Sequence, residues 1–286
     1  MNKNAVISRI GKDSCFPSWL NLEYSKRNWD LYLVFYDNES FKKFTPEDGV
    51  KKFYIKGGKL TGIHSFLKNE NILDNYNFFW IPDDDIEIDS ESINEMFNLM
   101  IAHNIEVGQP SLTIDSYFTY LLLIQNTSFK IRFSNFVEIM APCLKKNILE
   151  KCLSDFEDAF TGFGIDFLWS YYAEDKEDNI AIFDSISMKH TRPVGGPIYK
   201  ELQKNNLDHM EELKSIFKKY NQKQIRPFAY KAIDRNDIIQ ENRFILGFRT
   251  IIYFLQNFKM FLDRRKLLSK IFKIAKYYFI YRIKVK

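Results

Sequence analysis

Apolar residues along the first two thirds of the chain form short runs that alternate with amphipathic stretches. The amphipathic stretches predict helices near residues 60–67, 90–103 and 144–153. Alternation of this kind predicts an α/β fold, because strands that are buried between helices are nearly continuous apolar segments. The runs predicted to be strands are residues 5–10, 30–37, 53–56, 76–81, 105–109, 133–142 and 180–184.

The run at residues 76–81 ends at Pro82, and three consecutive acids follow it, Asp83, Asp84 and Asp85. A buried strand that ends in this way is typical of the carboxyl edge of an open α/β sheet, where such folds bind their ligands. Adjacent carboxylates repel one another, and a bound cation relieves the repulsion. Because residues i and i+2 of an extended chain point to the same side, Asp83 and Asp85 could share one hard metal ion.

Two other interpretations of the acidic run stay open. The acids could form a solvated turn that caps a helix beginning near Ser90. They could also belong to a phosphatase, with Asp83 as the nucleophile and Asp85 as the acid. The acidic run does not fit an EF-hand loop that begins at Asp83, because Ile88 stands where such a loop requires glycine.

Polar residues at other predicted strand ends are candidates for binding a nucleotide. A nucleotide could lie across the strand ends and contact Ser8, Arg9 and Asp37, or these could be ordinary polar residues at strand ends. Gly57-Gly58-Lys59 precedes a predicted helix, so its backbone N–H groups and the lysine could meet a phosphate. The segment lacks the P-loop pattern, and a plain turn into the helix is the alternative.

Two polar residues lie within or at the end of apolar runs. Gln109 ends one predicted strand beside Pro110. Glu138 lies inside another run, where an unpaired carboxylate is costly. The sequence leaves open whether Glu138 holds a substrate hydroxyl or a structural arginine such as Arg132.

Two later segments carry further candidate groups. Gly162-Phe163-Gly164 allows a close backbone approach, and Asp166 then either caps a helix or serves as a general base that contacts an acceptor hydroxyl. His190 and Arg192 follow the strand predicted at residues 180–184. An imidazole with two carboxylates is a plausible Mn²⁺ set, and an arginine can meet a phosphate.

The charge of the chain is unevenly distributed. The net charge is +4, but residues 243–286 carry twelve basic residues and one acid, which leaves a net charge of −7 on residues 1–242. Aromatic and aliphatic residues alternate with the basic ones in this tail. Such amphipathic helices bind anionic membrane surfaces. The alternatives are a helix that packs on the body of the protein and an arm that binds nucleic acid.

Three widely spaced cysteines, Cys15, Cys143 and Cys152, favour a reducing cytoplasm and make a zinc site improbable. Aromatic residues make up 16% of the chain, which excludes a disordered protein. The start of the chain does not resemble a signal peptide, and no apolar run has the length of a membrane-spanning helix.

Taken together, these segments resemble the GT-A glycosyltransferases. More narrowly, four strings in order are similar to the family catalogued as domain of unknown function 707, whose members are often assigned as glycosyltransferases. The strings are FWIPDDD at residues 79–85, QPS at 109–111, NFVEIMAP at 135–142 and GFGID at 162–166. The resemblance covers roughly residues 1–196. It departs from the common acceptor-site pattern of two adjacent acids, since Ile165 precedes the single Asp166.

The resemblance implies a GT-A-like, Rossmann-related mixed sheet and a metal-dependent transfer of sugar from a nucleoside diphosphate sugar. The acceptor would be a glycan or a lipid-linked molecule in surface polysaccharide synthesis, and nucleic acid would not be a partner. A Mn²⁺ or Mg²⁺ ion would be held by Asp83, Asp85 and His190. Asp166 would be the base in an inverting reaction, while a retaining reaction stays open. The donor would contact Ser8, Arg9, Asp37, Lys59, Asp83, Asp84 and Arg192, and the acceptor would contact Gln109, Glu138 and Gly164.

Three regions are therefore expected: a nucleotide-sugar and acceptor domain at 1–196, a helical linker at 197–242, and a basic membrane-associating tail at 243–286. The expected location is the cytoplasm, peripherally on the inner face of the cell membrane. Two other functions remain possible. One is the phosphatase, for which Asp155 and Asp158 would have to hold Mg²⁺, and the other is a non-enzymatic protein that binds membranes through its tail.

Overall fold

The structure is a computed structural model that describes residues 3–159, 161–173, 178–195, 209–222, 225–262, 264 and 266–281. Its strands are β1 (Asn4–Ile10), β2 (Trp29–Phe35), β3 (Val50–Tyr54), β4 (Phe78–Trp80), β5 (Ile86–Glu87), β6 (Val107–Leu112), β7 (Phe129–Ser134), β8 (Cys143–Lys145), β9 (Ile180–His190), β10 (Ala229–Asp234) and β11 (Ile239–Gln240). Its helices are α1 (Asn38–Lys43), α2 (Lys59–Glu70), α3 (Ser90–Ala102), α4 (Lys146–Asp158), α5 (Trp169–Tyr172), α7 (His209–Lys219), α8 (Arg243–Gln256) and α9 (Leu267–Phe279).

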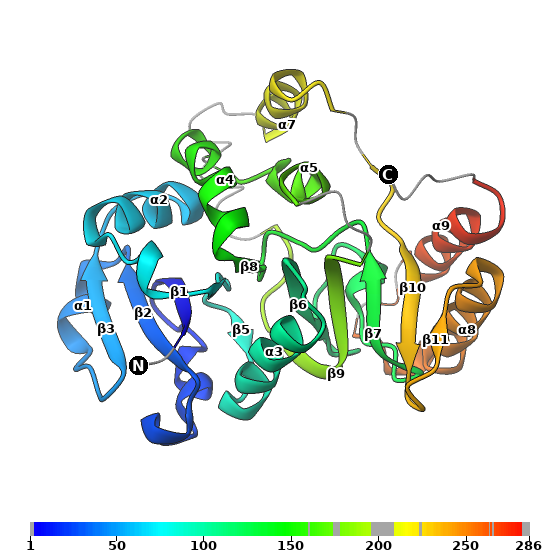
Figure 1. The fold of residues 1–286 in the computed structure, drawn as a ribbon, viewed down its shortest axis with the longest axis horizontal. Coiled ribbons are helices and arrows are strands. Elements are labelled where there is room, and N and C mark those ends of the chain that lie inside the picture. Colours follow the sequence, from blue (N-terminus) through cyan, green and yellow to red (C-terminus); the bar gives the residue numbers. More distant parts are fainter. Residues whose placement is uncertain are drawn as a thin grey trace.

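One mixed sheet organises the molecule, with the strand order β11-β10-β7-β9-β6-β8-β4-β1-β2-β3 and β5 paired with β9. Helices flank it on both faces. Figure 1 shows α2, α4, α5 and α7 along one side of the sheet and α3 on the other. The predicted α/β class is therefore confirmed.

The order of the strands creates a switch point beside β1. The chain runs outward from β1 to β2 and β3, then returns to β4 on the other side of β1, and all four strands are parallel. The segments that follow β1 and β4 consequently meet at one edge of the sheet. Open α/β sheets bind ligands at such an edge. β1 is buried along its whole length, as its apolar sequence requires.

The run at residues 133–142 is not the single strand that the sequence predicted. β7 ends at Ser134, whose hydroxyl accepts a hydrogen bond from the backbone N–H of Phe136 and turns the chain away from the sheet. The chain rejoins the sheet only at β8. Glu138 therefore lies in a connection between two strands, at the edge of the sheet.

The region expected as a helical linker, residues 197–242, also contains strands. Within its described part, α7 is helical, but β10 and β11 extend the sheet beyond β7. Pairing with β10 satisfies the backbone groups of β7 that would otherwise form an open edge. The sheet therefore does not end within residues 1–196, and the expected boundary between body and linker is corrected on this point.

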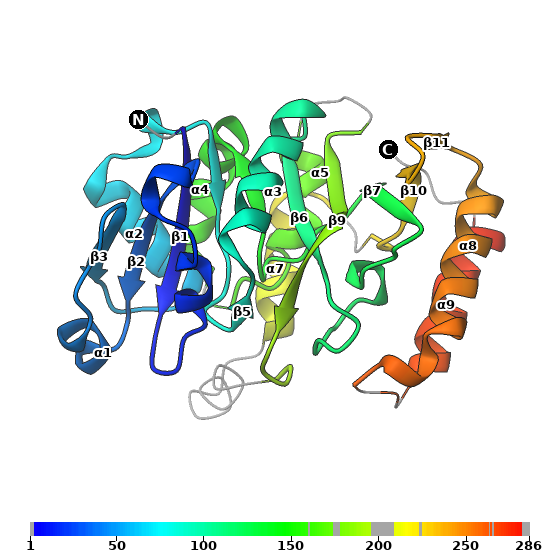
Figure 2. The same ribbon diagram turned by 90° about the horizontal axis from the view of Figure 1, so that it is seen from below.

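The basic tail forms a helical hairpin that packs against the end of the sheet (Figure 2). Leu246, Phe254, Ile271 and Tyr278 are buried there. A Cβ atom at Gly247 would lie 2.6 Å from Cβ of Tyr278, so only glycine lets the two helices approach this closely. One face of the tail thus packs on the body. No helix in the described part of the chain is long and apolar enough to cross a bilayer.

A buried ion pair joins β7 to β9. Arg132 donates to both carboxylate oxygens of Asp184, at 2.6 and 2.9 Å, and to the carbonyls of Leu122 and Ile124. Both side chains of the pair are fully buried. Arg132 therefore compensates Asp184 and is not the structural arginine that the sequence offered as a partner of Glu138.

Replacement of Arg132 by methionine should lower the free energy of unfolding by about 3–5 kcal/mol, because Asp184 would keep a buried charge without its partner. Urea denaturation measures the change. Lys130→Met is a matched control on the same strand, since the pair of Lys130 with Asp237 is exposed and should be worth less than about 1 kcal/mol. Equal, small losses in both variants would contradict this account of the core.

Candidate functional site

The acidic run Asp83–Asp85 connects β4 to β5 at the switch point. The hydroxyl of Ser8 donates to the carbonyl of Pro82 at 2.9 Å, and the backbone N–H of Asp83 donates to the carbonyl of Met140 at 2.8 Å. These bonds fix the backbone of the run between β1 and the 135–142 connection. Each of the three carboxylates then meets a different set of partners.

Asp83 pairs with Lys59, the first residue of α2, with 2.7 Å between Nζ and Oδ1. The same ammonium group donates to the carbonyls of Ile139 and Met140, both at 2.7 Å. Its three N–H groups are therefore all used within the protein. Burial, together with the charge of Asp85, outweighs Lys59 and raises the pKa of Asp83.

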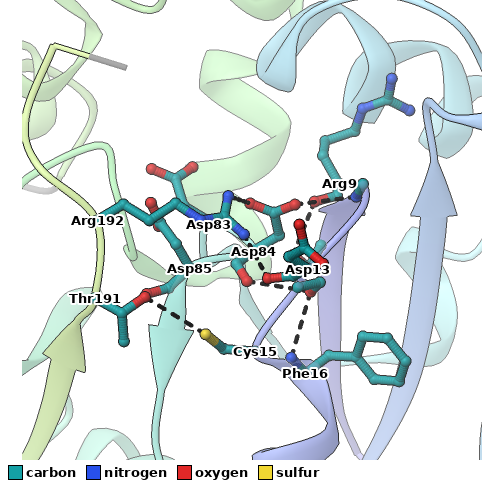
Figure 3. A network of polar contacts seen from close by, with 12 residues as sticks. Arg9, Asp13, Cys15, Phe16, Asp83, Asp84, Asp85, Thr191 and Arg192 are labelled. Carbon is teal, nitrogen blue, oxygen red and sulfur yellow. Dashed lines mark hydrogen bonds and ion pairs between the residues drawn. The ribbon is translucent and has the colours of Figure 1, made fainter. Parts of the chain in front are cut away.

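Asp84 holds together segments that are far apart in the sequence (Figure 3). One carboxylate oxygen accepts from the backbone N–H of Gly11 at 3.0 Å and from the hydroxyl of Tyr36 at 3.4 Å. The other accepts from Nη1 of Arg192 at 3.0 Å. Arg192 also donates to the carbonyl of Asp13 at 2.6 Å. The side chain of Asp84 thus links the segment after β1 to the segment after β9.

Asp85 faces His190, with 3.3 Å between Oδ2 and Nε2. Nδ1 of His190 lies 2.9 Å from the carbonyl oxygen of Tyr117, which can only accept a hydrogen bond, so Nδ1 carries a proton. A neutral His190 therefore presents the lone pair of Nε2 to a carboxylate. Only a proton on Nε2 or a cation between the two groups makes this contact favourable.

The contact between Asp85 and His190 is held by the backbone. Ile86 and His190 are opposite each other in the antiparallel pair of β5 and β9. The backbone N–H and the hydroxyl of Thr191 both donate to the carbonyl of Asp85, at 3.0 and 2.9 Å. Burial works against the charged form of Asp85, but the hydrogen bond and charge of His190 outweigh it and lower the pKa of Asp85.

The Asp85 and His190 side chains fit part of a divalent metal site. Oδ1 of Asp85 is buried and has no hydrogen-bond partner among the described residues. Two ligands about 2.1 Å from one ion and at right angles to each other lie about 3 Å apart, close to the observed separation. Within the described ranges, however, no three His, Cys, Asp or Glu side chains converge on one point. A metal ion here would need further oxygen ligands from a bound molecule or water.

Two carboxyl groups with raised pKa values adjoin this site. Burial raises the pKa of Glu138 to about 7, against the opposing effects of His190, a hydrogen bond from Thr119 and Lys59. Burial and the charge of Glu138 raise the pKa of Asp166 to about 8, although the backbone N–H groups of Ile139 and Gly164 donate hydrogen bonds to its carboxyl group. A carboxyl group with such a pKa can exchange protons near neutral pH.

Arg9, at the carboxyl end of β1, is buried with most of its donors unused. Nη2 donates to the carbonyl of Gly57 at 2.8 Å, while Nε and Nη1 have no partner in the part of the chain that the structure describes. Figure 3 shows the guanidinium group pointing away from the three aspartates. It lies against Gly62 of α2 and 5.7 Å from the ring of Tyr36. Burial lowers its pKa to about 10.

The other residues predicted for the site have internal hydrogen-bond partners. Asp37 caps α1 and accepts from the N–H groups of Glu39 and Ser40. Gln109 is fully buried and accepts from the N–H of Glu138 at 2.7 Å. Gly164 has a φ of +102°, which favours glycine there.

Sequence patterns did not indicate several residues that shape the site. Tyr117 orients His190, Thr119 contacts Glu138, and Tyr36 contacts Asp84. Glu212 of α7 accepts from the N–H groups of Thr161 and Gly162 and so fixes the segment before Asp166. These contacts join distant segments, and only for Tyr36, which follows a strand directly, did the sequence offer a local signal.

Asp155, a candidate for the metal site of a phosphatase, is occupied elsewhere. It accepts from Lys219 at 2.6 Å and from the hydroxyls of Tyr172 and Tyr220 at 2.6 and 2.5 Å. These bonds join α4 to α5 and α7. None of these hydrogen bonds places Asp155 beside Asp83, as a phosphatase site would require.

No family model matches the chain, and no curated protein matches it. Among solved structures, S. aureus TarS 1–349 in complex with UDP-GlcNAc is similar, with 11% identity, a TM-score of 0.51, and coverage of 96% of this chain and 80% of that chain. At this level of identity the likeness concerns the fold alone. The fold of this chain is GT-A-like.

Two further structures of the same protein are also similar. TarS 1–349 without a named ligand is 11% identical, with a TM-score of 0.48 and coverage of 75% of this chain and 70% of that chain. TarS 1–349 in complex with UDP is 11% identical, with a TM-score of 0.46 and coverage of 96% and 89%. Since no family model matches, the narrower resemblance to the family catalogued as domain of unknown function 707 stays a prediction.

Replacement of Asp85 by asparagine should lower the pKa of His190. Burial lowers this pKa, but the hydrogen bond and charge of Asp85 outweigh burial and hold it above its usual value. Titration of the histidine ring signals by NMR measures the change. Asp115→Asn is the control, because Asp115 pairs with the neighbouring Lys189. An unchanged His190 titration in Asp85→Asn would show that the two side chains do not interact.

Proposed function

We propose that this protein is a metal-dependent glycosyltransferase that moves a sugar from a nucleoside diphosphate sugar to a glycan or a lipid-linked acceptor in surface polysaccharide synthesis. The observation that carries the proposal is the contact of Asp85 with His190 at the switch point of a GT-A-like sheet. The proton on Nδ1 of His190 leaves Nε2 able to hold a cation, and the unpartnered oxygen of Asp85 supports a cation at this place. The TarS complex with UDP-GlcNAc makes uridine diphosphate sugars the first donors to test.

In this proposal Asp85 and His190 hold a Mn²⁺ or Mg²⁺ ion, and the diphosphate and water complete its ligands. When bound, the ion supplies positive charge that stabilises the leaving diphosphate. Asp83 and Asp84 are already compensated by Lys59 and Arg192. Their proposed part is to position Asp85 and to contact the donor from fixed places.

Arg9 supplies further donor contacts in this proposal. Its two unpartnered N–H-bearing nitrogens lie at the carboxyl end of β1, where a nucleotide would cross the strand ends. Burying such N–H groups without a hydrogen-bond partner is costly, and an oxygen of the bound nucleotide that accepts their hydrogen bonds would remove the cost. Ser8 and Asp37 act more indirectly, because their side chains hold the backbone around this place.

Asp166 is the proposed base. It is buried beside Glu138, and its carboxylate would accept the proton of the acceptor hydroxyl as the new bond forms, with inversion at the sugar. Because the pKa of Asp166 is about 8, its carboxyl group is mostly protonated at neutral pH in the free enzyme. Gln109 and Gly164 support the pair, since each provides a backbone or side-chain contact to Glu138 or Asp166.

The proposed place of action is the inner face of the cell membrane, with the protein bound peripherally. Lipid-linked acceptors would be met there, and the net positive charge of the tail favours an anionic surface. Nucleic acid is not part of the proposal. The phosphatase and the non-enzymatic alternative gain no support from the contacts of Asp155 and Asp83.

UDP should stabilise the protein against heat only when Mn²⁺ is present. At a hundred times its dissociation constant, a ligand adds about 2.7 kcal/mol of stability, which raises Tm by several degrees. Asp85→Ala should remove this effect. Asp74→Ala, which removes an exposed acid that pairs with Lys146 and lies before β4, should keep it. Equal stabilisation with and without Mn²⁺, or in Asp85→Ala, would count against the proposed metal site.

The rate of UDP release from UDP-GlcNAc should rise with pH, with a midpoint near pH 8, because Asp166 must lose its proton to act as a base. Asp166→Asn should lower the rate by about 10²–10⁴-fold. Glu138→Gln should shift the midpoint to lower pH, because it removes a neighbouring negative charge.

A stability measurement checks the same pKa without using activity. Between the unfolded pKa near 3.8 and the folded pKa of about 8, the folded state holds a proton that the unfolded state has lost. This group therefore makes the free energy of unfolding fall as pH rises through that range. Asp166→Asn should show a smaller fall in urea denaturation. A fall as steep as that of the wild type would place the pKa of Asp166 near its ordinary value.

A further inference from the structure

The C-terminal hairpin of α8 and α9 has a second apolar face that the body of the protein does not cover. Ten large apolar residues of residues 243–281 are exposed, with relative exposures from 42% for Phe279 to 66% for Ile280. Large contiguous apolar patches are rare on monomeric soluble proteins and mark interaction sites. The ten residues are Phe244, Ile245, Phe248, Leu255, Met260, Leu262, Leu268, Phe272, Phe279 and Ile280.

Six of the ten residues form one surface that spans both helices. In α8, Phe244, Phe248 and Leu255 follow one another by four and seven positions, and Leu268, Phe272 and Phe279 repeat this spacing in α9. Such spacing places side chains on one face of a helix. The rings of Phe244 and Phe279 stack with 6.0 Å between their centroids, so the exposed faces of the two antiparallel helices adjoin.

Basic side chains lie at the turn of the hairpin and along α9, next to this apolar surface. Lys259, Arg264, Lys266 and Lys273 are exposed, and Nζ of Lys276 lies 4.7 Å from the ring centre of Phe272. Three other cations of the hairpin face inward: Arg243 donates to carbonyls of Tyr277 and Tyr281, Arg249 pairs with Asp234, and Lys270 donates to the carbonyl of Phe118. The described part of the hairpin contains no acid. The outward face is therefore both apolar and cationic.

The hairpin lies near the proposed active site. Figure 2 shows the turn between α8 and α9 at the same end of the molecule as the carboxyl ends of β1 and β9. The ring of Phe261 contacts that of Phe118, and Lys270 donates to the carbonyl of Phe118 at 3.2 Å. Phe118 follows Tyr117, whose carbonyl fixes His190. A surface bound at the turn would thus lie beside the edge where donor and acceptor meet.

We infer that this face of the hairpin docks on an anionic lipid bilayer. Its apolar side chains would enter the membrane interface while its lysines stay among the headgroups. Binding is strong only where apolar burial and attraction to anionic headgroups act together. A second copy of the chain would bring two faces of the same positive charge together, which argues against self-association. Docking does not depend on sugar transfer, and it can be measured without a nucleotide.

Sedimentation of the full chain with lipid vesicles tests the inference. The protein should bind vesicles of phosphatidylcholine with phosphatidylglycerol, bind phosphatidylcholine alone about tenfold or more weakly, and lose binding as salt is added. The triple variant Lys259→Glu, Lys266→Glu and Lys273→Glu should lower the partition coefficient by about tenfold or more. Phe248→Ser with Phe272→Ser should lower it as well, through loss of apolar contact.

Matched controls separate this surface from charge and hydrophobicity in general. Lys42→Glu, Lys68→Glu and Lys214→Glu reverse three exposed lysines elsewhere, and Ile101→Ser removes an exposed apolar residue of α3. These variants should bind vesicles nearly as the wild type does. Circular dichroism confirms that every variant is folded.

Three results would overturn the inference: no binding to anionic vesicles, equal binding by the hairpin and control variants, or self-association in ultracentrifugation that the hairpin variants abolish. The proposed function is tested separately by the Mn²⁺-dependent effect of UDP. Vesicle binding without that effect would leave docking intact and reject sugar transfer, and the reverse result would reject docking alone.

Discussion

The electrostatic compensation of Asp83, Asp84 and Asp85 is the constraint on which the arrangement of the site depends. Three adjacent carboxylates at the edge of a sheet repel one another, and each must find a different source of positive charge or hydrogen bonds. Lys59 of α2 meets the first, Arg192 and the N–H of Gly11 meet the second, and His190 meets the third. The partners come from three separate parts of the chain. Their convergence draws α2, the segment after β1 and the end of β9 to one place.

The three carboxylates are not compensated equally, and the difference gives them different chemical capacities. Lys59 has no N–H group left for a ligand, and Asp84 uses both oxygens within the protein. Asp85 alone keeps a buried oxygen without a partner among the described residues. The two carboxylates with full internal partners stabilise the fold. Asp85 is incompletely paired, so a bound cation would interact most favourably there. A rigid neighbourhood of this kind preorganises a binding site.

Local patterns made much of the fold predictable, but pairing between distant segments was beyond them. The buried strand before Pro82 and the alternation of apolar runs predicted the α/β class and the edge at which the acids lie. The residues from Ser134 to Pro142 looked like a strand because they are apolar, yet the hydroxyl of Ser134 turns the chain out of the sheet. It could not be predicted either whether Arg132 would compensate Glu138 or Asp184, because the pairing of Arg132 with Asp184 joins two strands that are distant in the sequence. The contact of Tyr117 with His190 depends on tertiary structure alone.

The C-terminal hairpin shows how the same composition can serve two surfaces. A tail rich in aromatic residues and lysines is compatible with packing on the body and with binding a membrane, and its sequence does not separate the two. The structure divides its residues: Phe254, Ile271 and Tyr278 are buried against the body, while Phe248 and Phe272 stay exposed. Burial of the first set holds the helices rigidly, so the second set needs no folding on contact and loses less entropy when it is covered. Because Phe261 and Lys270 also contact Phe118 beside the residue that orients His190, the position of the hairpin is coupled by direct packing to the site at the sheet edge.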